Sequence, residues 1–122
     1  MELLADNVST TLLERSDVEE LVSEKNFEMM KDNHMNHARF VHSILAVPDA
    51  EILVETVVWV FKAYRSRGFH ANYWVAQLNA WISAINNHLD EESAKSVLPL
   101  YDWFIINIPA FSNLSDETGS ST

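Results

Sequence analysis

The chain has 122 residues, of which 48% are hydrophobic, so it is long enough to form one domain with a sizeable apolar core. Its 18 acidic and 8 basic residues give a formal net charge of −10, which argues against a basic surface for nucleic acid phosphates or anionic membranes. The absence of cysteine excludes disulfides, thiolate zinc sites and cysteine nucleophiles. No segment has the pattern of a signal peptide or a membrane span, and we expect a cytoplasmic protein.

The first third of the chain has the patterns of two or three helices. Residues 1–15 carry a weak helical repeat of leucine and valine, which predicts a short N-terminal helix. Ser16 and Glu19 have the spacing of a capping box, so we expect a helix over 17–31 to follow them. A polar break then separates this helix from another over 34–46. One unbroken helix over both segments is the alternative.

The segment 49–70 is the most apolar helical stretch, with apolar side chains around most of its circumference. Pro48 suits the first turn of a helix, and Asp49 complements the positive end of the helix dipole. Gly68 supplies a left-handed cap at the other end. A helix with so little polar surface must be covered on several sides, so we expect it to be the central helix.

Two further helices are predicted from the repeat of apolar residues every three or four positions. The first covers 70–89. The second follows Asp90 and contains Pro99, which predicts either a kink or a helix start at that residue. Pro109 ends this helix, residues 110–114 are expected to pack loosely, and residues 115–122 have the composition of a disordered tail.

We therefore predict an all-α fold, an antiparallel bundle of four main helices with a short N-terminal helix. Residues 1–114 would form this single domain, followed by the tail over 115–122. The few glycines and prolines, two and three, favour long helices and short loops.

His34 and His37 are three residues apart, a spacing that presents two imidazoles on one helix face. With Glu28 or Asp32 they would make a metal site, which needs at least three ligands. The alternative is that these histidines are solvated or pack against an acidic face, and we favour it, so no metal ligand is assigned.

Two features of the last helix point to a second buried surface. Trp103 and Ile106 lie off its main apolar stripe, which suggests a dimer interface, a partner-binding surface or a ligand groove. No Ser/His/Asp arrangement and no glycine-rich phosphate loop is found, so we expect no enzymatic activity.

The run HARFVHSILAVPDAEILVETVVWVFKAYRSRG, His37 to Gly68, resembles the helical-bundle module that precedes the cobalamin-binding domain in B12-dependent regulators and photoreceptors. The likeness lies in the order of His-Ala-Arg-aromatic, Leu-Ala, an Asp-led helix, Val-x-Trp and Arg-x-Arg-Gly. Trp59, nine residues and Phe69-His70 resemble the family's Trp, nine residues and Glu-His, with Phe69 in place of Glu. The family's Rossmann-like B12 domain, with its Asp-x-His-x-x-Gly motif, has no counterpart in these 122 residues.

This resemblance implies a regulatory, non-enzymatic sensor. Trp59 and His70 would contact a ligand, with Tyr73 and Trp74 beside them, and the ligand would be a small molecule or a tetrapyrrole-like compound. The module would form a homodimer or pair with a separate cobalamin-binding or signalling protein; no cofactor is identified. Two alternatives stay open: an adaptor that dimerises through Trp103 and Ile106 without a ligand, and a histidine/carboxylate metal-binding bundle.

Overall fold

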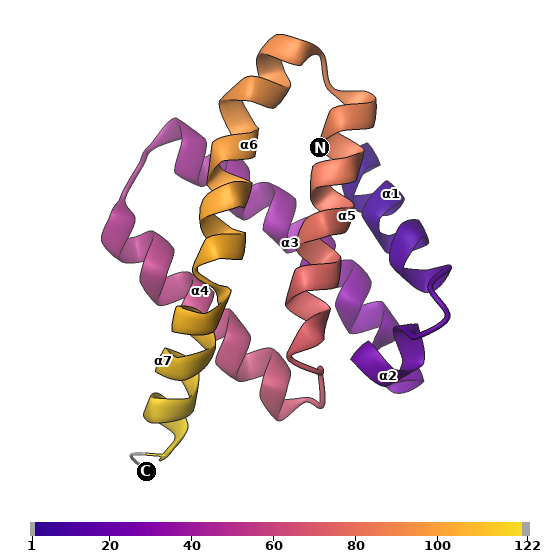
Figure 1. Ribbon diagram of the computed structural model, residues 1–122, viewed down its shortest axis with the longest axis vertical. Helices are drawn as coiled ribbons and strands as arrows, with labels where there is room; N and C mark the ends of the chain where they lie inside the picture. The colour runs from indigo at the N-terminus through magenta and orange to yellow at the C-terminus, as the bar shows by residue number, and fades with distance from the viewer. Residues whose placement is uncertain (1, 121–122) are drawn as a thin grey trace.

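The computed structural model describes the backbone of residues 2–120 and the side chains of residues 3–114. The described chain consists of helices and short connections, without strands, which confirms the predicted all-α class (Figure 1). Its elements in order are α1 (Glu2–Leu13), α2 (Val18–Val22), the 3₁₀ turn η1 (Glu24–Asn26), α3 (Phe27–Ala46), α4 (Ala50–Ser66), α5 (Asn72–His88), α6 (Glu91–Ile106) and α7 (Ile108–Ser120).

The helix at the centre of the fold is α5, and the prediction that segment 49–70 is central is wrong. α5 packs between α1 and α6, and α1 also packs on α3 (Figure 1). The buried side chains of α5 are Tyr73, Trp74, Ala76, Gln77, Leu78, Ala80, Trp81, Ala84 and Ile85. The alanines let neighbouring helices approach closely, while the rings fill the space between them.

α4 lies at the side of the molecule and pairs with α7 (Figure 1). Only Val57 and Phe61 of its side chains are buried, whereas Ile52 is 53% exposed and Trp59 is 66% exposed. A high apolar content therefore did not mean a central position. These pairings do not establish the finer prediction of a four-helix antiparallel bundle with an added N-terminal helix, because α1 belongs to the core and α4 pairs with α7.

The first long helix breaks earlier than predicted. Ser23 has a φ of 77°, in the left-handed region, and ends α2. The side chain of Asn26 then donates hydrogen bonds to the carbonyl of Val22 at 3.0 Å and to that of Arg67 at 2.8 Å. The break therefore rests on a contact with the distant end of α4.

Beyond this break α3 runs without interruption from Phe27 to Ala46. The predicted break near residues 31–34 is wrong, and so is the alternative of one helix over 17–46. The capping box is also absent, because α2 begins at Val18 with no side-chain cap. Arg15 instead forms an ion pair with Asp17, Nε to Oδ1, at 2.8 Å.

The ends of the later helices follow the sequence signals closely. Asp49 caps α4 by accepting a hydrogen bond from the Ile52 N–H at 3.1 Å, and Pro48 lies just before the helix rather than in its first turn. Asp90 caps α6 in the same way through the Ser93 N–H at 2.7 Å. Gly68 has the expected positive φ, 98°.

The C-terminal part departs from expectation. Pro99 lies inside a continuous α6, so a helix start at that residue is excluded. Asn107 ends α6, and Pro109 stands in the first turn of α7, where a missing N–H is tolerated. The expectation of loose packing after Pro109 is wrong for Phe111, which is 3% exposed. α7 continues to Ser120, into the predicted tail; residues 121 and 122 lie outside the described residues.

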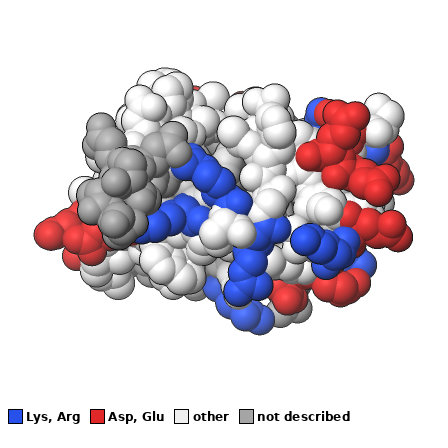
Figure 2. Space-filling model, turned by 90° about the horizontal axis from the view of Figure 1, so that it is seen from below, with Lys and Arg blue, Asp and Glu red and all other residues white. Residues whose placement is uncertain are grey.

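The charges are distributed unevenly over the surface. Figure 2 shows Lys and Arg side chains gathered across the end of the molecule where α4 ends, with Asp and Glu side chains around them. Arg65, in the last turn of α4, and Arg67, which follows it, belong to this end. A net charge of −10 is therefore compatible with a local cluster of basic side chains. Within the part of the chain that the structure describes, no helix is both long and apolar enough to span a membrane.

Candidate functional site

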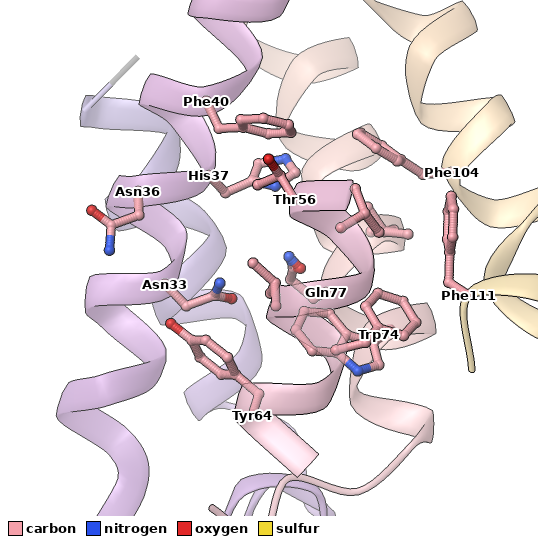
Figure 3. Close-up of a pocket in the computed structure, with 14 residues that line it drawn as sticks. Asn33, Asn36, His37, Phe40, Thr56, Tyr64, Trp74, Gln77, Phe104 and Phe111 are labelled. Atoms are coloured by element: carbon pink, nitrogen blue, oxygen red, sulfur yellow. The ribbon is translucent and has the colours of Figure 1, made fainter. Parts of the chain in front are cut away.

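A cavity of about 170 Å³ lies among α3, α4, α5 and the ends of α6 and α7 (Figure 3). Its aromatic lining residues are Phe40, Phe61, Tyr64, Trp74, Phe104 and Phe111. Its other apolar lining residues are Val57, Val60 and Leu78. Five helices thus contribute to one apolar space that is lined largely by rings.

The aromatic wall has defined geometry. Phe61 and Trp74 stack with centroids 4.5 Å apart and an interplanar angle of 6°. Phe111 meets Phe61 edge-on at 5.8 Å, and Tyr64 meets Trp74 edge-on at the same distance. Stacked and edge-to-face contacts are the preferred arrangements of such rings, so the rings of the wall stabilise one another.

The polar lining residues are all uncharged: Asn33, Asn36, His37, Thr56, Tyr64 and Gln77. No Asp, Glu, Lys or Arg lines the cavity among the described residues. An ion entering an apolar cavity loses its hydration, and this wall offers no opposite charge to compensate. The cavity is therefore suited to an uncharged molecule.

His37 belongs to this wall as a neutral imidazole. Burial, and secondarily the neighbouring His34, lowers its pKa from 6.5 to about 3. Its Nε2 lies 2.7 Å from the hydroxyl oxygen of Tyr101, within hydrogen-bond distance. The ring packs on Trp81, with centroids 4.8 Å apart. Since a base with such a low pKa takes up protons poorly near neutral pH, His37 is a hydrogen-bonding group rather than an efficient general base.

Gln77 is the polar residue of the wall with an unmet hydrogen bond. It is 2% exposed, and its Oε1 is buried without a hydrogen-bond partner in the described part of the chain. Among the described residues, the buried Nε1 of Trp81, one turn further along α5, has no partner either, but Trp81 does not line the cavity. Buried polar atoms without partners are uncommon and point to a missing water molecule or ligand.

A buried network supports the wall from behind. The Ser9 hydroxyl lies 2.7 Å from Nδ1 of His34, and Nε2 of His34 lies 3.1 Å from the Tyr73 hydroxyl. That hydroxyl donates to Oδ1 of Asn33 at 2.8 Å. An imidazole that carries its proton on Nε2 satisfies all three contacts, with Ser9 donating to Nδ1. The network joins α1, α3 and α5, and it orients Asn33 at the cavity.

Both histidine interpretations from the sequence need correction. His34 is fully buried, and burial lowers its pKa from 6.5 to about 4, so it is neither solvated nor packed on an acidic face. The metal alternative gains no geometric support either. Among the described residues, no three His, Asp or Glu side chains are placed to hold one metal ion.

The four predicted ligand contacts do not gather in one place. Trp74 lines the cavity, and Tyr73 lies behind the wall in the buried network. Trp59 is 66% exposed and does not line the cavity. His70 is exposed and lines a separate hollow together with Arg15.

The two predicted interface residues also differ from each other. Ile106 is 76% exposed, as a contact surface requires. Trp103 is half-buried, and its ring packs edge-on against Phe111 with centroids 5.4 Å apart. Trp103 therefore helps to hold α7 against the cavity in addition to any surface role.

The sequence reasoning missed Gln77, Asn33 and His37 as cavity residues. One signal was present for Gln77: it lies four residues after Tyr73 and four before Trp81, in the middle of the strongest apolar helix face. A polar residue at such a position is either paired or functional.

No protein-family model matches the chain, and neither the curated proteins nor the solved structures contain a significant match.

Proposed function

We propose that this protein is a non-enzymatic, sensor-type helical domain that binds a small uncharged molecule in the cavity between α3, α4 and α5. The observation that carries the proposal is the wall itself, which combines stacked rings with exclusively uncharged polar groups. An engineered apolar cavity of about 150 Å³ binds benzene, so a space of 170 Å³ is large enough for a one-ring compound.

The lack of an activated group in the wall supports binding rather than catalysis. His37, the titratable imidazole of the wall, has a pKa of about 3 and already bonds with Tyr101. The phenol of Tyr64 is held protonated, because burial raises its pKa. Neither group has the pKa near neutrality that suits a general acid or base.

The test is the melting temperature of the protein with and without toluene, an uncharged one-ring probe. At ten times the dissociation constant, a ligand that binds only the folded state stabilises it by about 1.4 kcal/mol, or about 5 °C for a domain of this size. Val60→Phe fills the cavity and should abolish the shift, whereas Ile52→Phe on the exposed face of the same helix should keep it. No shift with the unmodified protein at saturating toluene would contradict the proposal.

A corrin macrocycle is too large for a cavity of 170 Å³. The cobalamin connection suggested by the sequence therefore takes another form in this proposal, contact with a separate cobalamin-binding protein through exposed groups such as Trp59 and His70. Trp59→Phe keeps an aromatic ring at this 66% exposed position and should weaken such a complex without changing stability. Unchanged pull-down of cobalamin-loaded partner by the folded variant would remove this part of the proposal.

Homodimerisation is the second candidate, favoured by the 76% exposure of Ile106. A large apolar side chain in this position gains free energy when a second chain covers it. Ile106→Glu should then turn a dimer into a monomer in native mass spectrometry. It is a cleaner probe than Trp103→Glu, because Trp103 also packs on Phe111. A monomeric unmodified protein, or a dimer that survives Ile106→Glu, would exclude this interface.

A further inference from the structure

Cationic side chains from two elements meet at the end of the molecule where α4 ends. Lys62 and Arg65 lie three residues apart in the last turns of α4, and Arg67 follows directly. Lys25 belongs to η1, which is held against this end because the Asn26 side chain donates a hydrogen bond to the Arg67 carbonyl at 2.8 Å. Figure 2 shows Lys and Arg side chains gathered there. We call Lys25, Lys62, Arg65 and Arg67 the basic cluster.

The dipole of α4 explains only part of the basic cluster. Cations in the last turns of a helix complement the negative end of its dipole, which accounts for Lys62 and Arg65. Lys25 is not explained in this way, because η1 has three residues and is too short to build up a dipole. Cations that converge from two elements repel one another and oppose folding.

Three of these cations have no acidic partner within the described part of the chain. The side chains of Lys25, Lys62 and Arg67 are exposed, and the ion pairs of the described residues involve other basic residues. Arg65 donates a hydrogen bond to the Ser112 carbonyl, 3.4 Å away. The chain has 18 acidic residues with which it could neutralise the cluster. An anionic partner would therefore relieve a repulsion that the fold leaves uncompensated.

The surroundings of the basic cluster indicate which kind of anion fits. Asp and Glu side chains lie around the basic side chains (Figure 2). A flat anionic bilayer would face these carboxylates as well as the cluster and would be repelled by them. A narrow peptide can place several carboxylates in a row on the cluster alone, and charges more than about 8 Å away are largely screened at physiological ionic strength. We propose that the basic cluster docks a short acidic segment of a partner protein, at a site separate from the ligand cavity.

The experiment measures the fluorescence anisotropy of a short fluorescein-labelled glutamate peptide as the full chain is added, with a glutamine peptide of the same length for comparison. The chain should bind the glutamate peptide alone, and more weakly as salt is raised, because exposed charges are screened. Lys62→Glu should weaken binding about three- to tenfold, and a further Lys25→Glu should weaken it more.

The control is Lys95→Glu, which makes the same change in net charge. Lys95 is exposed and lies near the start of α6, at the end of the molecule opposite to the basic cluster (Figure 1). This variant should leave the dissociation constant within about a factor of two, since salt screens charges at such a distance. Lys25 and Lys62 are exposed and form no hydrogen bond with a described residue, so their variants should fold normally, which circular dichroism checks.

Three results would overturn the inference. The first is an unmodified chain that does not bind the glutamate peptide, or that binds the glutamine peptide equally well. The second is equal weakening by Lys62→Glu and Lys95→Glu, which would reduce the effect to net charge. The third is binding to phosphatidylserine vesicles in place of the peptide, which would assign the cluster to a membrane surface. None of them bears on the proposed ligand binding, because no residue of the basic cluster lines the cavity.

Discussion

Acidification should destabilise this protein well before its carboxylates are protonated, because two imidazoles stay neutral in the folded chain, that of the buried His34 and that of the half-buried His37. The pKa of His34 falls from 6.5 to about 4 on burial, and that of His37 falls to about 3. Between these values and 6.5 the unfolded chain binds protons that the folded chain does not, so stability falls as the pH falls. For His34 the loss between pH 7 and pH 5 is about 2 kcal/mol, and for His37 it is similar.

The combined loss of about 4 kcal/mol is a large part of the 5–15 kcal/mol that stabilises a typical domain. Asp17 and Asp90 also have lowered pKa values, from hydrogen bonds with Arg15 and with Ser93. Their contributions are present above pH 3.8 and are lost below it, outside this window. The interval between pH 7 and pH 5 therefore isolates the histidines.

The assay is urea unfolding followed by circular dichroism at pH 7 and at pH 5. His34→Gln should reduce the difference in unfolding free energy between the two pH values by about 2 kcal/mol, although the variant is less stable at pH 7. His42→Gln changes an exposed histidine of the same helix and should leave the difference as it is. If the unmodified protein is equally stable at both pH values, its imidazoles are protonated or hydrated in the folded state, and the reasoning is refuted.

Three further predictions concern residues at the ends of helices, and each is checked by the midpoint of urea-induced unfolding. Asn26→Ala removes the hydrogen bonds to two carbonyls and should cost about 1–3 kcal/mol; a loss below 0.5 kcal/mol would contradict a role in fixing the break. Gly68→Ala should cost about 1–2 kcal/mol from its positive φ alone, since the added Cβ would meet Nδ2 of Asn26 only at an ordinary contact distance of 4.0 Å; an unchanged midpoint would mean that the turn adapts. Asp90→Ala removes an N-cap and should cost about 1 kcal/mol, whereas Asp102→Ala, at an exposed position inside the same helix, should cost less.

The sequence predicted those parts of the fold that depend on neighbouring residues. The cap of Asp90 and the positive φ of Gly68 follow from residue type and local pattern, and both were found as expected. The break at Ser23 was not predictable in this way. It depends on a hydrogen bond from Asn26 to Arg67, 41 residues away, and no local pattern carries that information.

Which helix is the most buried was harder to predict from the sequence than where the helices lie. Segment 49–70 has more apolar residues than its position requires, since Ile52 and Trp59 are exposed. α5 includes polar side chains such as Gln77 and is nevertheless the buried centre. Apolar content reports how much surface a helix could bury, whereas burial depends on how many neighbours surround it.

The site was predicted only through Trp74. The resemblance described above suggested Trp74 as a neighbour of the ligand, and this residue does line the cavity. Asn33 and His37 reach the same cavity from another helix, and their part in it follows from partners on α5 and α6, Tyr73 and Tyr101. Sequence spacing places residues on one helix face but does not show which other helix that face will meet.

The hydrogen bond from the His70 amide to the carbonyl of Leu21, 2.8 Å long, has a consequence for amide exchange. The His70 side chain is exposed and the residue lies in a connection, where amides usually exchange fast with solvent. This amide is instead bonded to a residue 49 positions earlier, so it should exchange only when the segment around α2 moves away from the turn between α4 and α5. Its protection in deuterated water would measure directly how often the N-terminal part of the chain opens while the rest of the protein stays folded.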